Sequence, residues 1–135
     1  MEKKVLKFKT DREIDALIAQ KVFEQEVFWD DIIVNSGVTN FKPDFWVRIE
    51  SGQVKLLPYY SLDAERCIHE IVPKMKEHGY ILDADNKGEK GETWLATFMI
   101  EKEAEHKNDY GSAHDEIFSR AVCKAALAVF GIKIE

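Results

Sequence analysis

The stretch TWLATFMI, residues 93–100, constrains the fold more than any other part of the sequence. In a β-strand, successive side chains point to opposite faces of the sheet. Both faces of this segment carry apolar groups: Trp94, Ala96, Phe98 and Ile100 share one face, and Thr93, Leu95, Thr97 and Met99 share the other. We therefore expect this strand to lie in a sheet whose two faces are both partly covered.

Two β-hairpins are predicted around this pattern. One pairs the strand 93–100 with Tyr80-Ile81-Leu82 across the glycine-bearing polar segment DADNKGEKGE. The other lies earlier, where alternating residues 45–50 and 53–56 flank the turn Ser51-Gly52. Four strands in two hairpins follow from these patterns.

Three helices are predicted from their caps and apolar periodicity. Thr10 and Glu13 have the spacing of a capping box, so the first helix begins there, and we expect it to end near Glu26. In the second helix, Ser61 is the predicted cap and Gly79 lies just past the end. Its predicted buried face consists of Ala64, Ile68, Ile71, Val72 and Met75, flanked by Cys67.

The second and third helices carry two further signals. Pro73 lies inside the second helix, where a proline removes one backbone hydrogen bond and should kink it. The third helix is predicted to begin at a capping box formed by Ser112 and Asp115, and Gly131 suits its end.

The element order is therefore αββαββα. It predicts an α/β (α+β) fold in which helices pack on one four-stranded, mainly antiparallel sheet. With 135 residues and 45% hydrophobic residues, the chain can bury one core, so residues 1–135 are expected to form a single domain. Residues 1–10 are a basic N-terminal segment, and residues 27–44 are interpreted as a long connection between the first helix and the first hairpin.

The charge of the chain bears on its partners. The formal net charge is −6, and residues 1–10 carry +3 from four lysines against one glutamate, which leaves −9 for the remainder. An acidic surface argues against binding to a nucleic-acid backbone and leaves basic protein partners open. No apolar run is long enough to span a membrane, and Cys67 and Cys123 look like reduced core thiols. A cytoplasmic location is expected.

No residue pattern predicts a metal, a cofactor or a catalytic nucleophile. Cys67-x-His69 lacks the second ligand pair that a closed zinc site needs. Cys123 lies within a helix and lacks the helix N-terminus that would lower the pKa of a thiol. Asp30 and Asp31 beside Trp29 are the carboxylates that stand out most, and with His114 they leave a small hydrolase as a lesser alternative.

Large aromatic residues at loops or on the polar side of a strand are the remaining candidates for function. Such side chains often anchor a binding partner, although they can also fill the ends of a sheet. The predicted binding residues are Trp29, Asp30, Trp46, Arg48, Tyr59 and Tyr60, and Tyr110 has a similar setting. An alternative use is the capture of a nucleotide or another anionic small molecule by Arg48, Lys55 or Arg66 with an aromatic neighbour.

Several stretches together resemble a known family, the phage ABA sandwich domain of small phage and prophage proteins from Gram-positive bacteria. They are DREIDALIAQKVF at 11–23, PYYSLDAERCIHEIVPKM at 58–75, WLATF at 94–98 and AVCKAAL at 121–127. The resemblance implies a layered α/β/α fold, no assigned activity and no catalytic residues to transfer.

Together these observations predict a non-enzymatic accessory protein, encoded by a phage or prophage and acting in the cytoplasm of the host bacterium. It would bind a host or phage protein, for example as an inhibitor of a host enzyme or immune system. The alternatives that stay open are the module for an anionic small molecule and the hydrolase.

Overall fold

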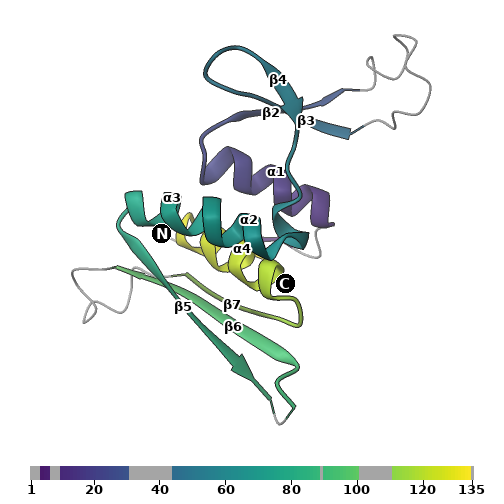
Figure 1. The fold of residues 1–135 in the computed structure, drawn as a ribbon. Coiled ribbons are helices and arrows are strands. Elements are labelled where there is room, and N and C mark those ends of the chain that lie inside the picture. The colour runs from purple at the N-terminus through teal and green to yellow at the C-terminus, as the bar shows by residue number, and fades with distance from the viewer. Residues whose placement is uncertain (1–3, 7–9, 31–43, 89, 101–110, 135) are drawn as a thin grey trace.

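The computed structural model describes residues 4–6, 10–30, 44–88, 90–100 and 111–134. Figure 1 shows three layers, with helices in the middle, one three-stranded sheet above them and another below. We call the sheet of β2, β3 and β4 the upper sheet, and the sheet of β5, β6 and β7 the lower sheet. The fold is thus mixed α+β, with the helices between two sheets.

The upper sheet is antiparallel, and β3 is its central strand. Its strands are β2 (Glu26–Asp30), β3 (Asp44–Arg48) and β4 (Val54–Leu56). The predicted hairpin of β3 and β4 is confirmed. The interpretation of residues 27–44 as a connection is wrong for its first part, because residues 26–30 pair with β3 along their whole length. Residues 31–43 lie outside the described residues.

The lower sheet is also antiparallel, and its strands are β5 (Tyr80–Lys87), β6 (Thr93–Ile100) and β7 (Gly111–Asp115). The predicted hairpin of β5 and β6 is confirmed. The capping box predicted from Ser112 and Asp115 is wrong, because both residues belong to β7 and pair with β6. Asp115 instead accepts a hydrogen bond from the backbone of Ile117 just before the last helix.

The first helix, α1 (Asp11–Lys21), begins at the predicted capping box of Thr10 and Glu13. It ends earlier than predicted, because the chain turns at Glu24, whose φ is +53°. That backbone conformation is uncommon for a residue with a side chain, and no local sequence pattern announces it. Ile14, Ile18 and Ala19 on its apolar face are buried.

The middle helix consists of α2 (Ala64–Arg66), a π turn (Cys67–Ile71) and α3 (Val72–Glu77). Asp63 caps it by accepting from the backbone of Arg66, so the predicted Ser61 cap is wrong. Ser61 lies one element earlier, in a short 3-10 helix at Tyr60–Leu62. There its backbone N–H donates to the carboxylate of Asp15 at 2.7 Å. Asp63, two residues later, caps the helix instead.

The π turn changes which residues of the middle helix face the core. Cys67, Ile71 and Met75 are fully buried, whereas Ile68 is 49% exposed, so the predicted buried face is only partly right. One extra residue in a helical turn rotates the direction of every side chain that follows it in the helix. The π turn ends at Ile71, two residues before Pro73, which lies in the first turn of α3, where a missing backbone N–H is tolerated.

The last helix, α4 (Phe118–Val129), lies between α1 and the lower sheet, and four of its buried residues are alanines: Ala121, Ala125, Ala126 and Ala128. Gly111 of β7 passes so close that a Cβ there would overlap the carbonyl oxygen of Ala125. Gly131 follows the helix with a φ of +85°, as predicted for its end. The strand β8 (Ile132–Ile134) then pairs in parallel with β1 (Lys4–Leu6).

The predicted four-stranded sheet and the order αββαββα are therefore wrong. The two predicted hairpins do not pair with each other, and each gains a third strand of its own, β2 or β7. The order of the described elements is β1, α1, β2, β3, β4, the middle helix, β5, β6, β7, α4 and β8. In the part of the chain that the structure describes, no helix has both the length and the apolar character needed to cross a membrane.

Candidate functional site: the outer face of the upper sheet

The upper sheet has one face on the core and one face turned away from it. Val47 is fully buried, and Val27 and Phe45 pack against the core. Because side chains alternate along a strand, the neighbouring residues must point to the other side of the sheet. We call this the outer face, made of Glu26, Phe28, Trp46, Arg48, Val54 and Leu56.

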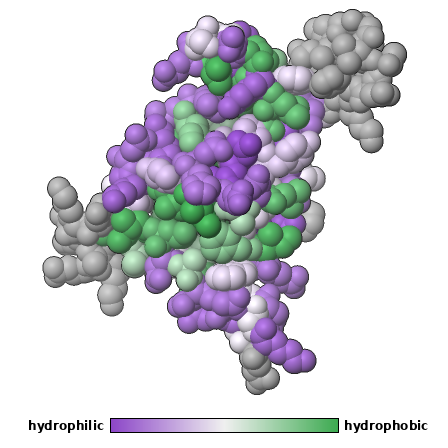
Figure 2. All heavy atoms as spheres, in the orientation of Figure 1, coloured by the Kyte–Doolittle hydropathy of each residue, from purple (hydrophilic) through white to green (hydrophobic). Residues whose placement is uncertain are grey.

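The register of the strands arranges the outer face in two rows. Phe28, Trp46 and Leu56 are direct neighbours in the first row, and Glu26, Arg48 and Val54 are neighbours in the second. Leu56 is 37% exposed and Val54 is 40% exposed, and Figure 2 shows apolar atoms over the upper sheet. Phe28 and Trp46 are only partly exposed, and the indole nitrogen of Trp46 is buried, so Val54 and Leu56 are the well-exposed apolar residues of this face.

A single ion pair organises the polar side of the outer face. Nε of Arg48 donates to Oε2 of Glu26 at 2.9 Å, and the guanidinium carbon lies 5.7 Å from the ring centre of Phe28. Both charged side chains are about half exposed or more, at 48% and 64%. Exposed pairs of this kind add little stability, so this one mainly orients Arg48 over the aromatic row.

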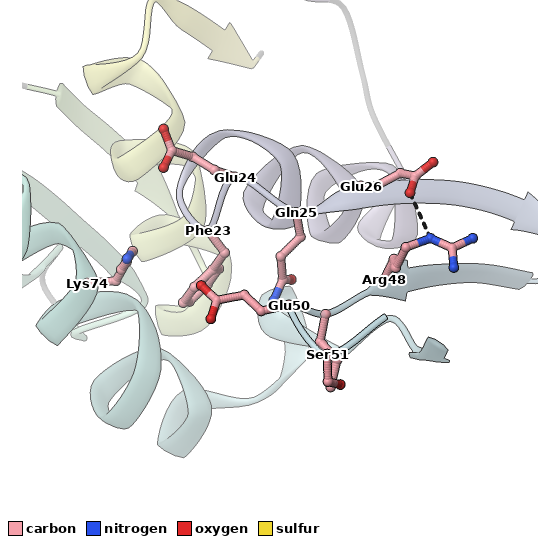
Figure 3. Close-up of a pocket in the computed structure, with 9 residues that line it drawn as sticks. Phe23, Glu24, Gln25, Glu26, Arg48, Glu50, Ser51 and Lys74 are labelled. Carbon is pink, nitrogen blue, oxygen red and sulfur yellow. Dashed lines mark hydrogen bonds and ion pairs between the residues drawn. The ribbon is translucent and has the colours of Figure 1, made fainter. Parts of the chain in front are cut away.

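An open pocket of about 750 Å³ adjoins the outer face. It lies between the turn after α1, the start of the β3–β4 turn and α3, as Figure 3 shows. The residues that line it are Phe23, Glu24, Gln25, Glu26, Arg48, Ile49, Glu50, Ser51 and Lys74. Glu26 and Arg48 therefore belong to both the pocket and the outer face.

Arg12 ties the upper sheet to the helices. Its Nε donates to Asp44 at the start of β3 at 3.1 Å, and one terminal nitrogen donates to the buried Asp15 at 3.0 Å. The same guanidinium donates to the backbone carbonyls of Leu57 and Pro58, and it stacks on the ring of Tyr59 at 3.9 Å. Burial raises the pKa of Asp15, and the hydrogen bonds from Ser61 and Arg12 oppose that rise.

The structure brings together two of the predicted binding residues, Trp46 and Arg48, on the outer face. Trp29 is 58% exposed but belongs to the other face of the upper sheet, where its ring meets Phe45 edge-on at 5.1 Å. Asp30 is the last residue of β2.

The two adjacent tyrosines have separate structural roles. Tyr59 covers Arg12, and Tyr60 is 2% exposed and stacks on Phe23 with ring centres 5.3 Å apart. Burial raises the pKa of the Tyr60 phenol. The predicted binding residues therefore do not converge on one pocket, and Tyr110 lies outside the described residues.

The residues required by the two alternative functions are also separated or already paired. His114 is in the lower sheet, on the opposite side of the helices from β2 and Asp30, and Asp31 lies outside the described residues. Arg66, a candidate for anion capture, donates to Glu70 at 2.7 Å.

Both cysteines pack in the core, as predicted. Cys67 donates from its sulfur to the carbonyl of Tyr60 at 3.1 Å, and burial raises the pKa of the Cys123 thiol. A buried thiol with a raised pKa is a poor nucleophile. Across the described ranges, no three His, Cys, Asp or Glu side chains are grouped so that they could hold a metal ion.

Sequence reasoning missed Phe28, Val54 and Leu56 as members of a surface, and Gln25 and Glu50 as pocket residues. Phe28 was missed because it falls in residues 27–44, which are interpreted as a connection, although the run EVFWD has the composition of a short strand. Val54 and Leu56 were recognised as one face of a strand. Only the pairing of three strands in register shows that this face continues Phe28 and Trp46.

The fold of this chain is similar to that of a known protein. It superimposes on the crystal structure of a phage protein from Bacillus cereus ATCC 14579 with a TM-score of 0.67 and 20% sequence identity, covering 95% of this chain and 94% of that one. At this level of identity, the likeness concerns the fold alone. No family model matches the chain, and no curated protein matches its sequence, so the resemblance to the phage ABA sandwich domain stays a prediction.

Proposed function

We propose that this chain is a phage- or prophage-encoded accessory protein that binds a basic protein of the bacterial host through the outer face of the upper sheet. The observation that carries the proposal is the row of Phe28, Trp46 and Leu56 on a face that the core does not use. Aromatic and aliphatic side chains grouped at the surface are common centres of protein interfaces.

The phage assignment is supported by two independent likenesses. One is the structural similarity to the phage protein from Bacillus cereus, and the other is the sequence resemblance to small phage proteins of Gram-positive bacteria. An inhibitor of a host enzyme or immune system would have this design, because it acts by occupying a surface and needs no catalytic group of its own.

The proposed charge of the partner follows from the charge of the chain. The net charge is −6, and Arg48, the one cation among the described residues of the outer face, is already paired with Glu26. A basic partner would be attracted over a distance and then held by the apolar row. The paired state of Arg48 also gives the anionic small-molecule alternative less support.

The first test is affinity capture from a lysate of Bacillus cereus with three baits. They are the wild-type protein, the double variant Val54→Ser/Leu56→Ser and the control Ile68→Ser, which changes an exposed aliphatic residue of the middle helix. We expect the same basic host protein on the wild-type and control baits and its loss from the double variant. A protein held equally by all three baits would count against the outer face.

The second test uses the captured protein after purification. In a direct titration, Trp46→Ala should weaken binding at least tenfold, since aromatic residues at the centre of an interface carry about 2 kcal/mol or more. Circular dichroism and thermal unfolding of each variant confirm that it remains folded. Undiminished affinity in both Trp46→Ala and the double variant would refute the proposal.

A further inference from the structure

The pocket beside the outer face has a distinct chemical character. Its lining contains three carboxylates, Glu24, Glu26 and Glu50, and two cations, Arg48 and Lys74. Each cation already has a carboxylate partner: Arg48 pairs with Glu26 at 2.9 Å, and Lys74 pairs with Glu77 at 3.2 Å.

Two carboxylates of the pocket therefore remain without a counter-ion. Within the described part of the chain, neither Glu24 nor Glu50 has an ion-pair partner, so the pocket carries an excess of negative charge. In Figure 3 the Glu50 side chain extends toward Phe23 and Lys74, whereas the Glu24 side chain points away at the rim. Glu50 is thus the carboxylate placed to meet a group inside the pocket.

Neutral features of the pocket also favour a cation with an apolar stem. Phe23 is held in place by stacking on the buried Tyr60, and Ile49 lines the same pocket. The Oε1 atom of Gln25 is buried and has no hydrogen-bond partner in the described structure, so an acceptor is left unsatisfied. Because this atom is buried, a bound ligand would not reach it, and Phe23 and Ile49 are the neutral groups that a ligand would contact.

The backbone at the pocket mouth is strained as well. Glu24 has a φ of +53° and is the one non-glycine residue with positive φ in the described part of the chain. This conformation belongs to the end of α1, where the backbone of Gln25 donates to the carbonyl of Ala19 at 2.9 Å. Here the turn places Gln25 directly before β2 and Glu26 at its first position, and both residues line the pocket.

From these features we infer that the pocket receives a lysine or arginine side chain of the partner. The ammonium or guanidinium group would meet Glu50, and its aliphatic stem would lie against Phe23. The inference rests on the proposed function, because it names the basic group that a partner on the outer face would insert. It also makes the pocket, rather than the apolar row, the source of selectivity for charge.

The test uses small probes and does not depend on a partner. N-acetyl-lysine amide and N-acetyl-arginine amide are titrated at low salt into isotope-labelled protein, and backbone amide shifts are recorded by NMR. N-acetyl-norleucine amide, which lacks the charge, and N-acetyl-glutamate amide, which reverses it, are the controls. We expect saturable shifts at Phe23, Gln25, Glu50 and Ser51 with the two cationic probes only.

Two charge variants give opposite predictions. Glu50→Gln should weaken binding of the lysine probe about threefold or more, because it removes the unpaired carboxylate. Lys74→Gln should strengthen binding, because it removes a like charge from the same pocket. A pocket built for an anion would show the reverse signs, and that result would overturn the inference.

The outcomes separate this inference from the proposed function. If the outer-face variants lose the host protein but no probe shifts the pocket amides, the pocket inference is wrong and the proposed function stands. If the cationic probes bind as expected but no partner distinguishes the outer-face variants, the pocket inference stands and the proposed function is wrong. Equal shifts with the norleucine probe would also overturn the inference, since charge would then play no part.

Discussion

The upper and lower sheets are both three-stranded and antiparallel, and each lays one face on the helices. Their inner faces are alike, with Val47 fully buried in the upper sheet and Ala96 and Phe98 fully buried in the lower sheet. Their outer faces differ. The lower sheet turns Asp83, Asp85, Lys87, Thr97, Ser112 and His114 outward with a few apolar residues, and Figure 2 shows its protruding tip as hydrophilic.

The difference shows which features the fold requires. A three-stranded sheet in this molecule needs one apolar face for the helices, and the lower sheet meets that need with a largely polar outer face. We therefore expect the exposed apolar residues of the upper sheet, Val54 and Leu56, to contribute little to folding. Four predictions test this contrast, from the largest expected effect on stability to the smallest.

The largest effect is expected where the lower sheet meets α4. In Gly111→Ala the new methyl group would overlap the carbonyl oxygen of Ala125 and lie 2.6 Å from the backbone nitrogen of Val129. Because backbone atoms cannot move aside cheaply, we expect a loss of at least about 3 kcal/mol in the free energy of unfolding, measured with urea.

The matched control is Gly52→Ala in the upper sheet. A Cβ at this position meets nothing within 4 Å, and only the positive φ of +86° opposes it. We expect a loss of about 1 kcal/mol. Equal losses in the two variants would mean that the close approach of β7 to α4 is not a tight contact.

The second prediction concerns the attachment of the upper sheet to the helices. Arg12→Met removes the contacts to Asp44 and to the backbone of residues 57 and 58, and it leaves Asp15 with a buried charge. We expect a loss of about 2–3 kcal/mol. Hydrogen exchange should accelerate first in β2 and β3, while β6 keeps its protection.

Arg66→Met serves as the control for Arg12→Met. The pairs of Arg66 with Asp63 and Glu70 are more exposed, so the expected loss is below about 1 kcal/mol. If exchange accelerated equally in both sheets of Arg12→Met, Arg12 would be stabilising the whole molecule rather than fixing the upper sheet.

The third prediction is a dependence on pH through Asp15. Burial raises its pKa in the folded protein above 3.8, so the folded state holds this proton more tightly than the unfolded chain does. The contribution of Asp15 to stability is therefore greatest at pH values below 3.8 and falls as the pH rises through the raised pKa.

Asp15→Asn removes this titration while keeping an acceptor for the backbone of Ser61. The free energy of unfolding of the wild type minus that of the variant should fall as the pH rises from about 3 to 7. A difference that rises over this range would show that the hydrogen bonds from Arg12 and Ser61 outweigh burial.

The smallest effect on stability is expected on the outer face. Leu56→Ser changes a residue on an edge strand whose three residues are all exposed, so the free energy of unfolding should change by less than about 0.5 kcal/mol. Val47→Ala on the inner face of the same sheet should cost about 2 kcal/mol. A large loss in Leu56→Ser would mean that the outer face has a structural role.

Local patterns in the sequence predicted the parts of the fold that depend on local physics. The capping box of Thr10 and Glu13 predicted the start of α1, and Gly131 marked the end of α4. Both hairpins followed from alternation and turn residues, because short connections force neighbouring strands to pair. Trp46 was predicted for the binding surface as a large aromatic residue on the polar side of a strand, and Arg48 as a cation with an aromatic neighbour.

The remaining features depend on contacts between distant parts of the chain. Alternation specifies a strand but not its neighbour, so the third strands β2 and β7 and the separation into two sheets were missed. Ser61 has the side chain of a cap, yet its backbone is taken by Asp15, 46 positions earlier. The pocket has no local pattern either, because its residues come from the turn after α1, the start of β2, the end of β3 with the turn after it, and α3.

The π turn at Cys67–Ile71 sets the register of the middle helix. In an α-helix each residue advances the direction of the side chains by about 100°, so one residue more or fewer rotates all that follows. Deleting one residue within the turn would restore the ordinary helical repeat and turn Met75 and Lys74 away from their present neighbours. The core and the pocket wall on α3 would shift together, so a one-residue change in length here would alter both the packing of the protein and the surface that it offers.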